Sequence, residues 1–425
     1  MNRHDIPGYD VLVVGAGPAG LAAAHAASAH GARIGIVDDN PLAGGQIWRG
    51  GPARQDDPRA QRMWADLQAA PNVRFLPRTR VLYAPAAGQL RVQTPSSSAT
   101  LHYKKLILAT GARERLLPFP GWTLPGVTGA GGLQALAKGG YPLRGKRVVV
   151  AGSGPLLLAV AATLRAQGAG IVAIVEQAAL PALARFAAGL LTTPPRLAQA
   201  LRLAGQLRGV PYLRDSYVRS AHGDGTLQAI QLQRAGAREL ETLQCDYLAC
   251  GYGLLPNVEL AQALGCATSS HGGQTSVSID TWQQTSTAGI YCAGEGTGVG
   301  GVDLALAEGR IAGLAASGHV TASHAAFAER TRWRKFATRL ERAFALRPEL
   351  RELAGDDTIV CRCEDVCHGE LRTHGSWRSA KLQTRCGMGP CQGRICGGAT
   401  EVLYGWRPDA VRMPISPARI STLIE

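Results

Sequence analysis

The chain has 425 residues, of which 46% are hydrophobic, and its formal net charge is +14. A chain of this length can hold two or three domains with cores of their own. The basic residues are dispersed and not interleaved with aromatic residues on one module, which argues against nucleic-acid binding and leaves a solvated surface, an acidic partner or an anionic membrane face. No secretory signal or unbroken apolar run of about 18 residues is visible, so we expect a cytoplasmic protein with room for peripheral contact at the cytoplasmic face of a membrane.

The amino-terminal segment has the pattern of a dinucleotide-binding βαβ unit. A strand, a glycine-rich turn, a helix and a second strand are predicted at residues 9–14, 15–20, 21–30 and 33–37. Gly15 permits the tight turn, Gly17 lets the backbone approach a pyrophosphate, and Gly20 allows close packing of helix and strand. Asp38 lies 18 residues after Gly20 and is placed to accept hydrogen bonds from an adenosine ribose.

A second βαβ pattern runs from the strand at residues 146–151 to Glu176. Gly152 and Gly154 fill the first two glycine positions, but Leu157 stands where the third glycine belongs. A branched side chain there would push helix and strand apart or shift the start of the helix. Glu176 favours a ribose 2′-hydroxyl over a 2′-phosphate. Three states of this site stay open: bound NAD, another adenine nucleotide such as ATP, or no nucleotide.

Two more strands end in turns that indicate FAD in the first site. Residues 106–111 end in Ala-Thr-Gly, and residues 289–295 end on an acid and precede a glycine-rich turn and a helix from about 302 to 316. These segments resemble the two-dinucleotide-binding-domain flavoproteins of the thioredoxin reductase and glutathione reductase superfamily. The resemblance implies further FAD contacts from a loop and from both strand ends, at Gly45, Gln46, Thr110, Gly111, Gly294 and Glu295. Glu295 departs from the usual Asp, and a plain turn is the alternative for Gly44 and Gly45.

No Cys-x-x-Cys or Cys-x4-Cys pair lies in the first 150 residues or between the two glycine motifs, so disulfide reductase chemistry is not supported. We expect the four cysteines before residue 300 to be small buried hydrophobic residues: Cys245, Cys250, Cys266 and Cys292. No Ser/His/Asp set or carboxylate pair stands out, and we name no catalytic side chain. That pattern is typical of a protein whose chemistry belongs to its cofactors.

Residues 327–344 have apolar side chains at helical spacing and a basic remainder. One interpretation is a helix that packs its apolar stripe on its own domain. The other is a docking helix for a partner protein or an anionic lipid surface. Pro348 predicts that the helix ends near Arg347.

Six of the ten cysteines lie between residues 361 and 396, a density that favours metal ligands over disulfides. The segment resembles the bacterioferritin-associated-ferredoxin-like 2Fe–2S domain, in which a Cys-x-Cys turn and a loop running into a helix each supply two thiolates. We expect as ligands the pair in the turn and two residues of the glycine-rich loop: Cys361, Cys363, Cys386 and Cys391. Cys396 falls in the predicted helix and should point away unless it replaces Cys386, and Cys367 is not expected to be a ligand. Structural zinc is the alternative metal.

These patterns predict an α/β fold with two Rossmann-like dinucleotide-binding domains and a small, α-rich carboxyl-terminal 2Fe–2S domain. The expected FAD domain comprises residues 1–115 and 285–325, and an NAD(P)-like domain at residues 116–284 interrupts it. A helical linker at residues 326–355 and the 2Fe–2S domain at residues 356–425 follow.

Over nearly its whole length the chain resembles the α-type subunit of the heteromeric amine dehydrogenases, the family that includes opine oxidase, D-hydroxyproline dehydrogenase and hydrogen cyanide synthase. The strings at residues 251–257 and 385–394 carry this resemblance. It implies a D-amino-acid-oxidase-like partner flavoprotein that oxidises an amino acid or opine, with room for a small third subunit, and electron transfer by this chain to an acceptor. Two alternatives remain: a self-sufficient NAD(P)H-dependent flavin reductase and a non-catalytic iron or redox sensor.

Overall fold

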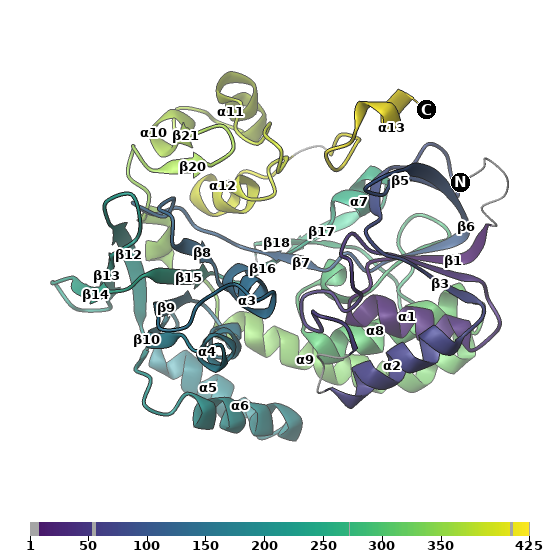
Figure 1. Ribbon diagram of the computed structural model, residues 1–425, viewed down its shortest axis with the longest axis horizontal. Helices are drawn as coiled ribbons and strands as arrows, with labels where there is room; N and C mark the ends of the chain where they lie inside the picture. The colour runs from purple at the N-terminus through teal and green to yellow at the C-terminus, as the bar shows by residue number, and fades with distance from the viewer. Residues whose placement is uncertain (1–7, 53–56, 272, 409–410, 425) are drawn as a thin grey trace. The chain divides into compact units, whose positions relative to one another are not determined.

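The structure is a computed structural model that describes residues 8–52, 57–271, 273–408 and 411–424 (Figure 1). Its described residues form two compact units, each built from separate stretches of the sequence. The first unit comprises the described parts of 1–113, 255–337 and 410–425, and the second comprises those of 114–254 and 338–409.

The first unit is built on a mainly parallel sheet with the strand order β3-β2-β1-β6-β5-β4, and β19 lies beside β6. Its strands are β1 (Tyr9–Val14), β2 (Ile34–Val37), β3 (Val73–Leu76), β4 (Arg80–Tyr83), β5 (Gln89–Gln93), β6 (Ser98–Leu108) and β19 (Ile290–Cys292). A smaller hairpin pairs β17 (Thr268–His271) with β18 (Gln274–Val277). Because β1, β2, β6 and β19 run parallel, their carboxyl ends meet at one edge, where parallel sheets bind ligands.

Two small-residue helices, α1 (Pro18–Ser28) and α8 (Val302–Ala316), pack closely in the first unit. A Cβ on Gly309 or Gly313 of α8 would overlap the carbonyls of Ala19 and Ala23 in α1. The alanine and glycine content of both helices is therefore a packing requirement. The unit also contains α2 (Pro58–Ala69), α7 (Glu259–Ala263) and α13 (Ile420–Ile424).

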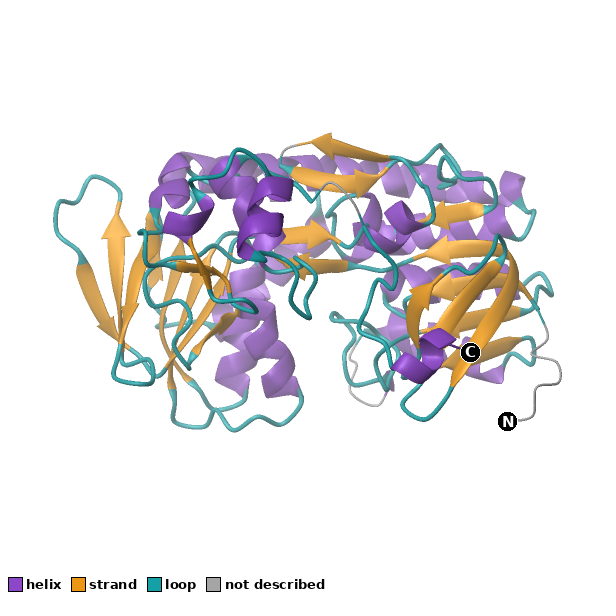
Figure 2. Cartoon of the chain, turned by 90° about the horizontal axis from the view of Figure 1, so that it is seen from above, coloured by secondary structure: helices purple, strands orange, loops and turns teal. Residues whose placement is uncertain are grey.

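The second unit contains a parallel sheet with the order β11-β10-β9-β15-β8 and an antiparallel sheet β12-β13-β14. Figure 2 shows the strands in orange and the helices in purple. The strands are β8 (Val127–Gly129), β9 (Arg147–Gly152), β10 (Gly170–Glu176), β11 (Tyr212–Leu213), β12 (Ser216–His222), β13 (Ala229–Arg234), β14 (Glu241–Gln244) and β15 (Tyr247–Gly251). The helices are α3 (Ala130–Lys138), α4 (Leu156–Ala166), α5 (Leu180–Leu190) and α6 (Pro194–Gln206). The chain passes between the units along β7 (Ala112–Glu114) and β16 (Leu254–Pro256).

The cysteine module, residues 359–404, also belongs to the second unit. It consists of β20 (Ile359–Cys361), β21 (Val366–Cys367), α10 (His368–Leu371), α11 (Trp377–Thr384) and α12 (Cys396–Tyr404). Trp122 connects the cysteine module to the rest of the second unit. The indole nitrogen of Trp122 donates to the carbonyl of Ile359 at 2.6 Å, and the Arg362 side chain stacks over the Trp122 ring.

The expected domain boundaries differ from the units in two places. The chain re-enters the first unit at Leu255 and not at residue 285, because β17, β18 and α7 pack there. The described residues after 410 also belong to the first unit and not to the cysteine module. Ile415 donates its backbone N–H to Leu82 at 2.9 Å, and Arg419 donates to the carbonyls of Thr94 and Ser97.

Helix α9 (Phe327–Ala343) confirms the predicted linker helix, but it ends before Arg347. Its stripe is buried, with Trp333 and Phe336 at 4% and 8% exposure, so it packs on its own chain as the first interpretation expected. No helix among the described residues is long and apolar enough to cross a membrane.

Candidate cofactor sites

The first glycine turn connects β1 to α1 and depends on glycine at two positions. Gly15 has a φ of 104°, and a Cβ there would overlap the carbonyl of Ala109. A Cβ on Gly20 would overlap the carbonyl of Gly15, so a larger residue would push α1 away from β1. Gly17, before the helix, is partly exposed. The turn leaves the start of α1 accessible, where backbone amides favour a phosphate.

Asp38, at the end of β2, is hydrogen-bonded to this turn and remains partly exposed to solvent. Its Oδ2 accepts from the backbone N–H of Ala16 at 2.6 Å, and its Oδ1 accepts from the backbone and side-chain amides of Asn40, both at 2.8 Å. The residue is only half-buried, and a carboxylate has lone pairs to spare. Ribose hydroxyls can therefore still reach it.

The loop at Gly44, Gly45 and Gln46 lies against the same turn. Gly44 donates its N–H to Ala16 at 2.6 Å, and a Cβ on Gly45 would come within 3.0 Å of the Cα of Gly17. The two glycines thus pack on the turn and are more than a plain surface loop. Gln46 is exposed, and its Oε1 accepts from Arg49 at 2.7 Å.

Thr110 and Gly111 follow β6 and are hydrogen-bonded to Asn257, which the sequence analysis named only as the end of the string at residues 251–257 and gave no role. Thr110 Oγ1 donates to the carbonyl of Asn257 at 2.7 Å, and the side-chain amide of Asn257 donates to the carbonyl of Thr110 at 3.0 Å. The backbone N–H of Asn257 donates to Gly111 at 3.0 Å. These reciprocal bonds fix the turn beside the first glycine motif.

Glu295 lies in the 3₁₀ turn η2 (Gly294–Thr297) that follows β19. One carboxylate oxygen accepts from the N–H of Gly301 at 2.9 Å. The other, Oε2, is buried and has no hydrogen-bond partner within the described ranges. Burial raises the pKa of Glu295 to about 7. A buried oxygen without a donor is costly unless a ligand hydroxyl supplies one.

Glu308 is a second buried acid at this site that the sequence analysis missed. It is 1% exposed on α8, and its Oε2 accepts from the N–H of Gly294 at 3.1 Å and from Thr297 Oγ1 at 2.6 Å. Arg334 of α9 donates to its other oxygen at 2.8 Å. The available sequence signal was an acid in the middle of an Ala-rich helix.

The first site therefore fits FAD. The open helix start suits the pyrophosphate, Asp38 suits the adenosine ribose, and the unpartnered oxygen of Glu295 suits a hydroxyl of the flavin side chain.

The second glycine turn has the same path but is covered. Gly152, Ser153 and Gly154 are all buried, and Glu176 is 0% exposed. The Glu176 oxygens accept from the N–H groups of Gly154 at 2.8 Å and Ala178 at 2.9 Å. Burial raises the pKa of Glu176 to about 7.

Leu157, in place of the third glycine, is accommodated in the core beneath the second turn. It is 2% exposed and packs among the residues between β9 and α4. Helix α4 begins two residues after Gly154, whereas α1 begins one residue after Gly17. The helix start is therefore shifted, which is one of the two outcomes expected for a branched side chain at this position.

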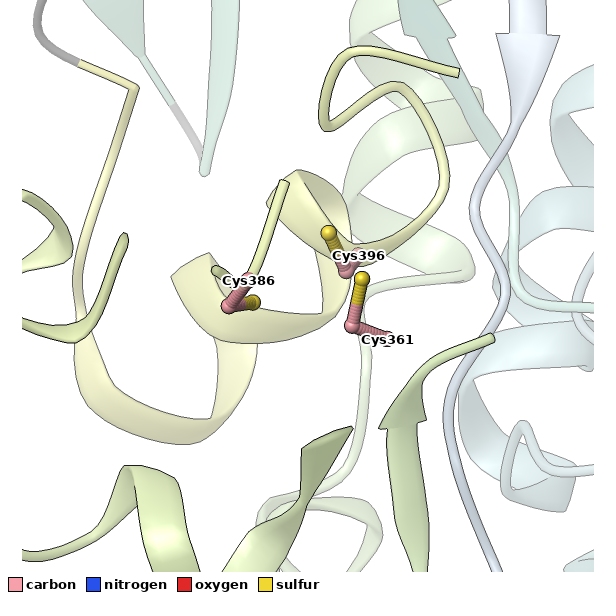
Figure 3. Close-up of side chains that lie close together, drawn as sticks. All are labelled: Cys361, Cys386 and Cys396. Carbon is pink, nitrogen blue, oxygen red and sulfur yellow. The ribbon is translucent and has the colours of Figure 1, made fainter. Parts of the chain in front are cut away.

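In the cysteine module, Cys361, Cys386 and Cys396 bring their sulfurs within 4.8 Å of one another (Figure 3). They are 1%, 0% and 1% exposed. Hydrogen bonds from Cys386 and Cys396 lower the pKa of Cys361 to about 2, which favours a thiolate there. Cys396 begins α12 and, against the simpler expectation, does not point away.

Cys363 and Cys391 form a second, more exposed pair. The backbone N–H of Cys391 donates to the Cys363 sulfur, and the two thiols share a hydrogen bond. Cys363 is exposed and Cys391 is half-buried. Five thiols thus gather in two adjoining groups. Cys367 stands apart from them, since it caps α10 and its thiol donates to the carbonyl of Asp357 at 3.5 Å.

Two glycines shape the loop that carries these thiols. Gly387 and Gly393 have φ values of 78° and 77°, and both lie against the ring of Trp377. The N–H of Gly387 also donates to the Cys361 sulfur at 3.5 Å. Thiols supported by a backbone amide are the donor set of an iron–sulfur cluster, so the residues present fit one. The other four cysteines are buried free thiols, as expected.

Comparisons with known proteins place the chain among flavoprotein oxidoreductases. The family model described as "Pyridine nucleotide-disulphide oxidoreductase" matches residues 9–317. The chain is 34% identical to the opine oxidase A-type subunit of Rhizobium meliloti, with 92% of this chain and 90% of the relative covered. It is 32% identical to the hydrogen cyanide synthase subunit HcnB of Pseudomonas aeruginosa, with 96% and 97% covered.

Among solved structures, the L-proline dehydrogenase of P. horikoshii matches with a TM-score of 0.70 and 18% identity, covering 98% of this chain and 79% of that one. The thioredoxin reductase of Lactococcus lactis matches with a TM-score of 0.55 and 19% identity, covering 74% of this chain and 99% of that one. At these identities the likeness concerns the fold.

Proposed function

The chain belongs to the family of pyridine nucleotide-disulphide oxidoreductases, together with its opine oxidase relative and HcnB, and from this membership we propose that it is the electron-transfer subunit of a heteromeric dehydrogenase. It is an FAD-dependent oxidoreductase. The substrate class that we propose is an amino acid or opine of the D-hydroxyproline, octopine or nopaline type, oxidised at a C–N bond by a D-amino-acid-oxidase-like partner protein. The proposed assembly is completed by a small third component and a separate electron acceptor.

The observation that carries this proposal is the convergence of five thiols in a chain that also has an FAD-type site. A flavin can hold two electrons and a 2Fe–2S cluster takes them singly, so the pair can divide a two-electron load. Disulfide exchange finds no support in the first unit, because Cys266 and Cys292 are buried there as separate free thiols. Burial also raises the pKa of the Cys292 thiol, which makes it a poor nucleophile.

In the first unit, the chain's task is to hold the flavin in place. The turn at Gly15 and Gly17 and the start of α1 would hold the pyrophosphate, and Asp38 the adenosine ribose. Glu295 would accept a hydrogen bond from a hydroxyl of the flavin side chain. Glu308 and Asn257 would hold the flavin-binding turns in position, since they form hydrogen bonds with the backbone of Gly294 and Thr110. Gly45 and Gln46 would line the remaining side of the proposed flavin site.

In the second unit, we propose that Cys363 and Cys391 bind one iron of a 2Fe–2S cluster and that Cys361 binds the other. The fourth ligand is Cys386, as the sequence favoured, or Cys396, which lies equally within the buried group. Burial of this group protects it from solvent, whereas Cys363 lies at the surface, where an acceptor can approach.

The test is to copurify the chain with the proteins encoded beside it, without oxygen, and to measure its visible spectrum, iron and acid-labile sulfide. We expect bound flavin, two irons and two sulfides per chain, and flavin reduction when an amine substrate of the partner is added. Zinc in place of iron, or a chain free of flavin, would overturn the proposal.

Serine variants of the cysteines locate the ligands. Cys363→Ser and Cys391→Ser should each remove the iron, and of Cys386→Ser and Cys396→Ser only one should do so. Cys367→Ser is the matched control and should keep full iron content, because Cys367 lies outside both groups. Iron retained in Cys363→Ser would contradict the ligand assignment.

A further inference from the structure

The two βαβ units end their second strands on equivalent acids, but only the first acid is accessible. Asp38 is half-buried, whereas Glu176 is 0% exposed. The turns differ in the same way, because Gly17 is partly exposed and Gly154 is buried. Part of the cover over the second turn is a segment of the chain itself.

That segment is residues 344–347, which directly follow α9 and belong to the second unit. Ser153 Oγ, between the two turn glycines, donates to the carbonyl of Phe344 at 3.0 Å. The side-chain amide of Gln177, next to Glu176, donates to the carbonyl of Ala345 at 3.0 Å and to Ser153 Oγ at 2.9 Å. The backbone N–H of Arg347 donates to Gln177 Oε1 at 3.1 Å. The segment is thus hydrogen-bonded to the turn and to the end of β10.

Apolar packing and ion pairing hold the segment at both ends. The Phe344 ring lies 3.9 Å from the position of a Cβ on Gly154 and packs edge-to-face on Phe186 of α5, with centroids 5.2 Å apart. Arg347 pairs with Asp215 at 3.1 Å. Upstream, Arg339 donates to the carbonyl of Gly189 at 2.9 Å.

A dinucleotide in this fold lies over the glycine turn and reaches the acid at the end of the second strand. Here the turn is covered by Phe344, and both oxygens of Glu176 already accept from backbone amides. A nucleotide would have to displace a segment held by several hydrogen bonds and by the half-buried ring of Phe344.

We infer that residues 344–347 take the place of a nucleotide in the second site and so determine the electron source: the protein does not accept hydride from NADH or NADPH. Gln177 and Ser153 are the residues that hold this segment in place. The inference goes beyond the proposed function, because it depends neither on the amine substrate nor on the metal that the cysteines bind.

The first experiment uses the full chain saturated with FAD, so that the first site is filled. Equilibrium dialysis with NADH, NADPH and ATP, each at millimolar concentration, should detect no saturable binding, and NADH should not bleach the flavin in stopped-flow measurements. Saturable binding of any of the three nucleotides would overturn the inference. A chain that contains no iron or binds no partner protein would contradict the proposed function, but the nucleotide-binding result would be the same.

The second experiment measures hydrogen exchange of the backbone amide of Arg347, which donates to Gln177. This amide should exchange slowly in the wild type and at least 10-fold faster in Gln177→Ala, which removes its acceptor together with the donor to the carbonyl of Ala345. Gln206→Ala, at an exposed position of α6, is the matched control and should exchange as the wild type does. Fast exchange in the wild type, or no change in Gln177→Ala, would show that the segment is not held over the turn.

Discussion

Glu308 and Arg334 form an ion pair in which the Glu308 side chain is 1% exposed and the Arg334 side chain is 45% exposed, with 2.8 Å between Oε1 and Nη2. The pair joins α8 to α9, and the second oxygen of Glu308 holds Gly294 and Thr297. One buried carboxylate therefore connects the turn beside the proposed flavin site to the helix that leads out of the first unit.

We predict that Glu308→Ala destabilises the protein by about 2–4 kcal/mol and weakens FAD retention, because it removes the acceptor of the buried Gly294 N–H and of the Thr297 hydroxyl and breaks an ion pair whose carboxylate is buried. Urea unfolding and the flavin-to-protein absorbance ratio after gel filtration measure both effects. Arg310→Ala, at an exposed position of the same helix, should leave them unchanged. Full flavin content and wild-type stability in Glu308→Ala would refute this role.

A second prediction concerns the unpartnered oxygen of Glu295. Glu295→Ala should weaken FAD binding roughly 10- to 100-fold, the range expected when a hydrogen bond to a charged acceptor is lost. Glu295→Asp keeps the carboxylate and should restore most of the affinity. Titration of apoprotein with FAD, followed by quenching of flavin fluorescence, gives the dissociation constants. Equal affinities for the wild type and the Ala variant would mean that the oxygen does not face the flavin.

Glu176 predicts a pH dependence of stability. Burial raises its pKa in the folded state to about 7, from 4.5. The folded state then binds more protons than the unfolded state between these values, so stability falls as pH rises from 4.5 to 7. In Glu176→Gln this titration is absent. The decrease in the free energy of unfolding between pH 4.5 and pH 7.5 should therefore be smaller than in the wild type by up to about 3 kcal/mol.

Chemical unfolding at several pH values measures that slope, which is independent of the absolute stability of each variant. Glu329→Gln, at an exposed position of α9, is the control and should keep the wild-type slope. An unchanged slope in Glu176→Gln would show that Glu176 is accessible and ionised normally.

The glycines of the cysteine loop give a fourth prediction. Gly387→Ala should cost about 1–3 kcal/mol and lower the iron content, because Gly387 has a positive φ and its Cβ would come within 2.6 Å of the Trp377 ring. Gly375→Ala is the control, since among the described residues nothing lies within 4 Å of its Cβ and its φ is not positive. Thermal unfolding and iron analysis of the two variants check the difference, and equal iron contents would contradict it.

Local sequence determined much of this protein. The turns at Gly15 and Gly152 could be read directly, because the close approach of backbone to backbone at these positions admits only glycine. The buried strands and α8 followed from apolar periodicity, and the helix at 327–343 from its apolar stripe. The density of cysteines near the carboxyl end also predicted a metal site, and the structure brings three of these thiols together in a buried group that fits one.

Only the tertiary structure decided how distant groups meet. Phe344 and Ser153 are 191 residues apart, and nothing in the glycine motif indicates that its own chain covers it. Cys396 lies in a helix, yet the turn of the loop before it directs its sulfur toward Cys361. Glu308 gained its role from Gly294 and Arg334, which reach it from other elements. Burial and hydrogen bonding depend on neighbours brought together by folding, and local sequence patterns contain no information about those neighbours.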